Sequence, residues 1–208
     1  MHRLLALAVM FAATSLAAPS TAEADGFYFT ESFGGSHIKD ELGQYMDSSF
    51  RLRLSAGMRR GHWAVDAWFA TDIGGTDQPE TGYYATHFLD TYGLDLRYIQ
   101  PIADHLEIYL RGSMSHGSLY LEDSVDSDYG GRGLGFGGGI QLKGKVRALG
   151  FLAWPLFFTK IGPKVTASLF LDNGYDFYRL HRGNDFDAPA IDAQLTHMTL
   201  GFSVGSDF

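Results

Sequence analysis

The last segment of the chain, Thr196 to Phe208, constrains the fold more than any other. From Met198 onward, apolar side chains recur at almost every second position, with small or polar residues between them. Successive side chains of an extended strand point to opposite faces, so the pattern predicts a β-strand with one apolar face. In a soluble protein, a last strand ending on Phe208 would leave that ring and the sheet edge in water. We therefore expect the sheet to close on itself, with lipid against its apolar face.

Seven earlier segments have the length and pattern of further strands. They are residues 25–36, 49–59, 63–72, 88–99, 105–121, 132–142 and 164–179. Each reaches the roughly 9 to 11 residues that a tilted transmembrane strand needs. Long polar connections, at residues 37–47, 74–87, 122–131 and 181–190, alternate with short turns. The sequence therefore predicts an all-β fold, an eight-stranded antiparallel up-and-down transmembrane β-barrel.

The alternation also predicts which side chains face lipid. In residues 49–59, Phe50, Leu52 and Leu54 share one face, and Arg51 and Arg53 share the other. We expect the apolar set to face lipid and the charged set to face the barrel interior, or lumen.

The first segment, residues 25–36, leaves its facing open. If Phe27, Phe29 and Phe33 face lipid, then Glu31 faces lipid with them, unless a β-bulge intervenes. In the opposite register, the three Phe side chains fill the lumen. The pattern alone does not choose between these arrangements.

The alternating final strand with its terminal Phe208 resembles the closing strand of bacterial outer-membrane β-barrels. In pattern, the chain is similar to the small OmpA/OmpX/OmpW-like families. The resemblance implies that Phe208, together with Phe202, is a barrel-assembly signal. It also implies a place in the cell outer membrane, and outer-membrane lipid, lipopolysaccharide, the barrel-assembly machinery and periplasmic chaperones as partners. The roles known for such families are envelope integrity, surface adhesion and small-solute passage.

Two segments are expected to lie outside the strands. Residues 1–24 are typical of a cleaved signal peptide, with Arg3 before an apolar run and an A-x-A site ending at Ala24, so residues 25–208 form the barrel. Residues 146–158 are apolar without alternation and contain Pro155. Because a ninth strand there would give an odd count, we expect a periplasmic-side insertion.

Composition excludes some functions and agrees with the strand pattern. Hydrophobic residues make up 45% of the chain, yet mean hydropathy is only -0.08, because apolar and polar residues interleave. The chain has no Cys, although export would permit disulfides. A net charge of -8 argues against nucleic acid as a partner.

Charged residues on the lumen side of the expected strands form the main candidate site. They are Arg51, Arg53, Arg97 and Arg111 with Asp66, Asp95, Glu107 and Asp172. Unpaired buried charges cost several kcal/mol each, so equal numbers of each sign predict a paired network. Eight strands leave an interior only just wide enough for side chains. We expect a plugged lumen; the alternative is a narrow gated path for ions or small solutes through exchangeable ion pairs.

A second candidate is the sequence His116-Gly117-Ser118, followed by Glu122. It resembles the His-x-Ser pair of outer-membrane lipid A 3-O-deacylases, which implies a catalytic Ser, His and Glu on the lipid-facing wall. In that family the carboxylate comes from the following strand, whereas residues 132–142 offer none and Glu122 would replace it. The alternative is a solvated His and Ser at the end of a strand.

No cofactor and no metal site are expected. The eight His residues are scattered without the spacing of metal ligands. Acidic residues of the connections, such as Asp126 and Asp128, lack the remaining ligands of a calcium loop, so solvated connections are the default.

Overall fold

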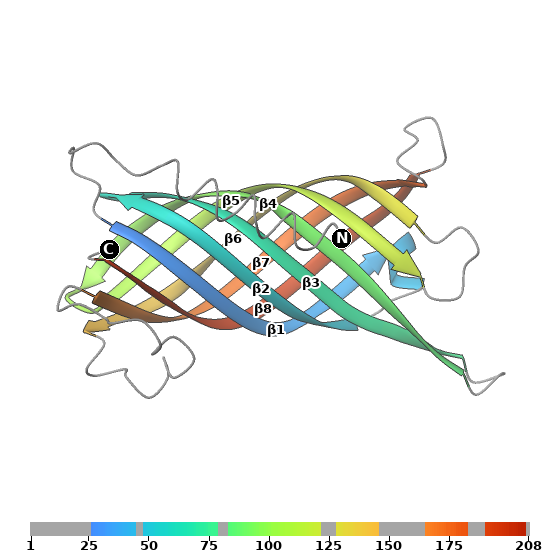
Figure 1. Ribbon diagram of the computed structural model, residues 1–208, viewed down its shortest axis with the longest axis horizontal. Coiled ribbons are helices and arrows are strands. Elements are labelled where there is room, and N and C mark those ends of the chain that lie inside the picture. The colour runs from blue at the N-terminus through green and yellow to red at the C-terminus, as the bar shows by residue number, and fades with distance from the viewer. Residues whose placement is uncertain are drawn as a thin grey trace.

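The protein folds into a closed antiparallel barrel of eight strands in which each strand pairs with its sequence neighbours and β1 pairs with β8 (Figure 1). The computed structural model describes residues 26–44, 48–78, 83–121, 128–145, 165–182 and 190–206. Its elements are β1 (Gly26–Asp40), the 3-10 helix η1 (Glu41–Gln44), β2 (Ser48–Arg60), β3 (Trp63–Gln78), β4 (Tyr83–Ala103), β5 (Leu106–Leu121), β6 (Asp128–Lys145), β7 (Val165–Arg182) and β8 (Ala190–Ser206). The predicted up-and-down barrel is therefore confirmed.

Several expected features lie outside the described residues. They are the signal peptide of residues 1–24, the insertion at residues 146–158, and the terminal Phe208. Within the ranges that the structure describes, no helix is long and apolar enough to cross a membrane.

The two ends of the barrel differ in their connections. We name the turn end for the short connections that join β2 to β3 and β4 to β5. At the first of these, Gly61 has a φ of 58°, which glycine adopts without steric cost. The backbone N–H of Ile99 donates to the carbonyl of His62, which ties the turn to β4. We name the opposite end, where β1, β3, β5 and β7 finish, the loop end.

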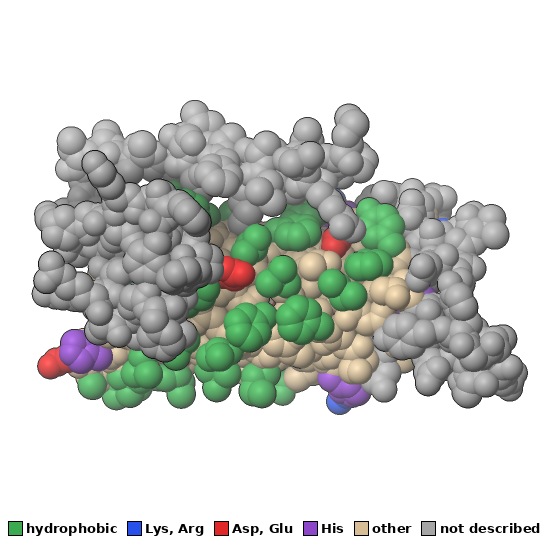
Figure 2. Space-filling view, turned by 60° about the horizontal axis from the view of Figure 1, so that its bottom comes forward, with side chains coloured by type: hydrophobic (Ala, Val, Ile, Leu, Met, Phe, Trp, Pro, Cys, Tyr) green, Lys and Arg blue, Asp and Glu red, His purple; other side chains and the backbone are tan. Residues whose placement is uncertain are grey.

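Side chains alternate between the outer wall and the lumen as predicted. In β2, Phe50 is 52% exposed and the neighbouring Arg51 is 0% exposed. In β3, Val65 lies on the outer wall and Trp68 is buried in the lumen. Figure 2 shows hydrophobic side chains gathered over the visible part of the outer wall. An antiparallel barrel in lipid needs this apolar belt outside and polar groups inside.

The structure also determines the facing of β1. Phe29 and Phe33 are 46% and 49% exposed on the outer wall, whereas Tyr28 and Ser32 are buried in the lumen. The register with β2 runs without a bulge from Gly26 to His37. Glu31 therefore shares the outer wall with the Phe residues, between Leu54 of β2 and Phe202 of β8.

The strands are longer than expected, and this corrects the predicted connections. β3 continues to Gln78 and β4 begins at Tyr83, so most of the predicted loop at residues 74–87 is strand. A polar segment without apolar alternation does not distinguish the end of a strand from a loop. At the turn end, β4 extends to Ala103 through a register shift beside Pro101, a position where a strand tolerates proline.

Candidate functional site

Charged side chains of six strands meet inside the barrel. We call them the lumen charge network: Arg51, Arg53, Arg59, Arg97, Arg111 and Lys143 with Asp66, Asp72, Asp95, Glu107, Asp172 and Asp176. The network contains equal numbers of each sign. Alternation places each member on the lumen face of its strand.

At the turn end, Glu107 of β5 is the centre of the network. Arg59 of β2 donates to both of its carboxylate oxygens, at 2.9 and 3.1 Å. Lys143 of β6 lies 2.8 Å from the same carboxylate, and Gln141 also donates to it. One carboxylate thus joins three strands, and its lone pairs are well satisfied.

The next layer is built on Arg97 of β4. Its Nε and Nη2 atoms each lie 2.6 Å from a different carboxylate oxygen of Asp66 on β3, a bidentate pair. Its guanidinium also donates to the hydroxyl of Tyr28 at 2.5 Å. The rings of Tyr28 and Tyr109 flank the same cation, with centroids 5.1 and 5.4 Å from its Cζ. These contacts hold Arg97 in one position.

Charged side chains in the middle of the lumen join strands that are not neighbours in the sheet. Arg111 of β5 donates to Asp172 of β7 through Nη2 at 3.1 Å and through Nε at 3.3 Å. Tyr109 donates to the same carboxylate at 2.6 Å. Arg53 pairs with Asp95, and its Cζ lies 4.4 Å from the ring centroid of Trp68.

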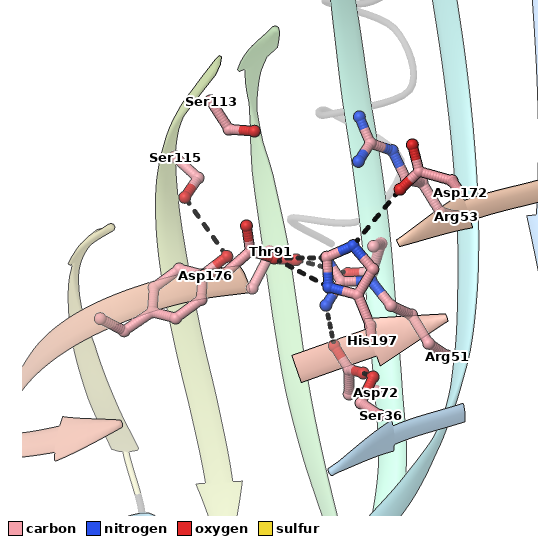
Figure 3. A network of polar contacts seen from close by, with 12 residues as sticks. Ser36, Arg51, Arg53, Asp72, Thr91, Ser113, Ser115, Asp172, Asp176 and His197 are labelled. Atoms are coloured by element: carbon pink, nitrogen blue, oxygen red, sulfur yellow. Dashed lines mark hydrogen bonds and ion pairs between the residues drawn. The ribbon is translucent and has the colours of Figure 1, made fainter. Parts of the chain in front are cut away.

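Nearer the loop end, Arg51 bridges two carboxylates. It donates to Asp72 of β3 at 3.1 Å and to Asp176 of β7 at 3.2 Å (Figure 3). Ser36 of β1 donates to Asp72 at 2.6 Å. His197 of β8 lies beside this group, with Nδ1 3.4 Å from Asp176, and it accepts from Arg111 at 2.6 Å. Side chains of six strands, β1, β2, β3, β5, β7 and β8, therefore meet in this part of the lumen.

The loop end of the lumen is apolar instead of charged. We call this group the apolar lumen cluster: Ile38, Leu42, Leu89, Leu119, Tyr178, Leu180, Ala193 and Leu195, each at most 3% exposed. Leu42 comes from η1, which follows β1 directly. The strand pattern does not predict this cluster, because part of it belongs to predicted connections.

One cavity lies between the charged side chains. Thr30, Arg97, Asp172 and their neighbours line a cavity of about 20 Å³. A cavity of this size holds on the order of one water molecule. The lumen-facing glycines of β6 contribute to the filling, because Tyr178 packs over Gly133 and Tyr109 packs over Gly139.

All eight residues of the predicted charge network lie in the lumen, and each contacts an opposite charge. The prediction omitted Arg59, Asp72, Lys143, Asp176 and His197. Four of these residues could have been predicted, because alternation places them on the lumen face of their predicted strands. They are Arg59, Asp72, Asp176 and His197. Lys143 has the same facing but follows the predicted end of its strand.

His116 and Ser118, the catalytic candidates, lie on the outer wall of β5 toward the loop end. The ring of His116 packs on Tyr92 at 5.3 Å between centroids. Both residues are described, and no hydrogen bond joins them. The register instead places Asp90 of β4 directly opposite Ser118. Glu122 lies outside the described residues.

The remaining site predictions concern assembly and metals. Phe202 lies half-buried on the outer wall, opposite Glu31 of β1 and Leu169 of β7. Among the residues that the structure describes, no group of three or more His, Asp or Glu side chains is placed to hold a metal ion.

Comparisons with known proteins agree with this architecture. The family model described as outer membrane protein beta-barrel domain matches residues 4–144. The crystal structure of Neisserial surface protein A has a TM-score of 0.55 at 16% identity, over 89% of this chain and 98% of that chain. This likeness supports the fold.

Two other solved structures have lower scores. Ail of Yersinia pestis has a TM-score of 0.49 at 13% identity, over 88% of this chain and 99% of that one. OprG of Pseudomonas aeruginosa has a TM-score of 0.45 at 11% identity, over 89% and 98%. The search of curated proteins found no match.

Proposed function

The chain belongs to the family of outer membrane protein beta-barrel domains, and on that premise we propose that it is a structural barrel whose plugged lumen passes no solute. It resides in the cell outer membrane. Its contribution is to envelope integrity or surface interaction, made through the outer wall and the loop end. In this family the short turns face the periplasm, so the loop end faces the exterior.

The filling of the lumen carries this proposal. Along the barrel axis, a solute meets first the apolar lumen cluster and then the lumen charge network, where Arg97, Asp172 and their neighbours line a cavity of about 20 Å³. To pass, it would have to displace bidentate pairs such as Arg97 with Asp66. Breaking a buried pair costs about 3 to 5 kcal/mol. Several such pairs in series oppose conduction.

Conductance across planar bilayers tests the closed lumen. We expect no current steps from the purified protein under conditions in which a general porin conducts. Reproducible unitary steps from the wild-type barrel would refute the closed lumen and favour the gated path.

Permeability of the envelope tests the structural role. We expect a strain without the gene to become more sensitive to detergent and to large antibiotics, and the wild-type gene to restore resistance. Unchanged sensitivity would argue against envelope integrity and leave surface interaction as the role.

One observation favours an enzyme as the second candidate. Ser118 has Asp90 directly opposite on β4, and His116 lies on the same wall two residues away. A nucleophile, a base and a carboxylate on one patch are the groups that acyl transfer requires. Purified protein incubated with lipid A would then release a 3-hydroxy fatty acid, and Ser118→Ala would abolish the release. No release from the wild-type protein would exclude this candidate.

A further inference from the structure

The chain turns back toward the lumen directly after β1. The turn occurs at Asp40, whose φ of 65° lies in the left-handed region, and in the described part of the chain no other non-glycine residue has a positive φ. η1 follows at once and contacts β1 and β8 at the loop end. A residue with a Cβ adopts a left-handed φ at an energetic cost, which is smaller for aspartate than for most residues. Asp40 is therefore a strained joint between the barrel wall and η1.

η1 is anchored in the lumen by one apolar side chain, that of Leu42. It is 0% exposed and belongs to the apolar lumen cluster, together with Leu89 of β4 and Leu119 of β5. Gly43, the next residue, lies close to the wall, because a Cβ added there would lie 3.0 Å from the carbonyl oxygen of Ile38. η1 thus lies against the barrel wall at the loop end, with Leu42 inserted among side chains from several strands.

The polar contact of η1 with the wall is weaker than its apolar one. Glu41 is exposed, and its carboxylate accepts a hydrogen bond of 3.1 Å from the backbone N–H of Asp192 on β8. An exposed hydrogen bond contributes little to stability, because water competes for both groups. The burial of Leu42 therefore supplies most of the free energy that holds η1 in place.

Burial of one leucine sets the scale of this equilibrium. It favours the observed position of η1 by a factor of about ten to a hundred. Moving η1 away relieves the left-handed φ of Asp40, which reduces that factor. A displaced state with a population on the order of 1 to 10% follows, as is usual for a two-state element. The strands, in contrast, are paired along both edges in the closed barrel.

We propose that η1 is a lid on the loop end of the lumen, hinged at Asp40 and held closed by Leu42. When the lid opens, Leu42 leaves the apolar lumen cluster and side chains such as Leu89 and Leu195 become accessible from the loop end. The loop end thus has two alternative surfaces, and the apolar one is present only in the open state. The lid is independent of the structural role proposed above, because the lumen charge network stays paired in both states.

Thiol labelling tests the lid, because the chain has no Cys and an introduced Cys is the single target. The reporter is Leu195→Cys, at a position of the cluster that is 0% exposed. The reagent is a negatively charged methanethiosulfonate, which reacts only with an accessible thiol. Mass spectrometry measures the labelling rate of the full-length mature barrel in detergent, and the mobility of unheated samples on gels verifies that each variant is folded.

Three substitutions are combined with this reporter. Leu42→Ala removes most of the anchor and should raise the labelling rate about tenfold or more. Asp40→Val should raise it about tenfold, because a β-branched side chain does not tolerate a φ of 65°. Lys39→Val is the matched control, since Lys39 is the exposed neighbour and has no positive φ. It should leave the rate unchanged.

A second reporter, Thr199→Cys, distinguishes the lid from opening of the whole barrel. Thr199 is 3% exposed and lines the cavity between the charged side chains. Its labelling should stay slow in all variants, because the lid opens only the loop end. Should Leu195→Cys fail to fold, Leu89→Cys replaces it, at another position that is 0% exposed.

Equal labelling of Leu195→Cys with and without Leu42→Ala would overturn the lid. Equal acceleration by Lys39→Val and Asp40→Val would also overturn it, because Asp40 would then not be a hinge. Faster labelling of Thr199→Cys in the Leu42→Ala variant would overturn it as well, since the barrel and not η1 would then be opening.

Discussion

Arg111 lies at the centre of the lumen charge network, where it contacts Asp172, Asp95 and His197. Replacing Arg111 by Ala leaves the buried carboxylate of Asp172 without its arginine and Asp95 with Arg53 alone. We expect the free energy of unfolding to fall by about 3 to 5 kcal/mol. Urea unfolding in lipid vesicles, followed by tryptophan fluorescence, measures this loss. Arg60→Ala is the control, with an expected change within about 0.5 kcal/mol. A similar small change for Arg111→Ala would contradict the network's structural role.

Two glycines test how closely the lumen is packed. A Cβ added at Gly133 would lie 2.5 Å from Cδ1 of Tyr178, whereas a Cβ at Gly112 on the outer wall meets nothing within 4 Å. Gly133→Ala should therefore reduce the free energy of unfolding by about 1 to 3 kcal/mol, as overpacking does. Gly112→Ala should leave it nearly unchanged or raise it. Urea titration of both variants in the same vesicles measures the two changes in the free energy of unfolding. Equal changes would mean that Tyr178 moves aside without loss of stability.

The sequence predicted the faces of these residues but not their partners. Alternation alone placed Arg51, Arg97 and Asp172 in the lumen. Contacts such as that of Arg51 on β2 with Asp176 on β7 cross the barrel. They depend on strand tilt and stagger, which no single strand encodes. The predicted set therefore omits residues such as Arg59, Asp72 and Asp176, which pair with its members inside the barrel.

At the scale of the strand, β1 departs from the general pattern. Glu31 lies on the outer wall between Phe29 and Phe33, within the apolar belt. A charged side chain facing lipid destabilises a barrel, by less for acidic than for basic residues. The same Glu31 left the facing of this strand open at the level of sequence. Only the closed register with β2 and β8 decides it.

We expect Glu31→Leu to stabilise the folded barrel in phospholipid vesicles by about 1 to 2 kcal/mol, because the belt becomes uniformly apolar. The matched substitution Glu107→Leu faces the lumen and removes the partner of Arg59 and Lys143, so it should destabilise the barrel. The urea midpoints of unfolding of the two variants, each compared with that of the wild type, measure these two changes in stability. A loss of stability in Glu31→Leu would show that the carboxylate has a favourable partner on the outer wall.

In the described part of the barrel, the outer wall exposes a belt of apolar side chains and the lumen buries charged ones, the reverse of a soluble domain. Exposed outer-wall residues include Leu94, Leu110, Met114 and Leu134. Such a surface needs lipid or detergent. We predict that the cleaved protein stays folded only in detergent or lipid and precipitates when these are removed. A monodisperse folded species in plain buffer, detected by light scattering and circular dichroism, would contradict the reversed arrangement.

At the loop end, the apolar lumen cluster gives the barrel a packed hydrophobic core of its own. The connections that start there extend from strand ends that this cluster packs together. Loops that extend from such strand ends can change in length and composition while the membrane-spanning part of the barrel stays intact. The scaffold is thus suited to carrying foreign peptides on a cell surface, with the join between β3 and β4 as a graft site.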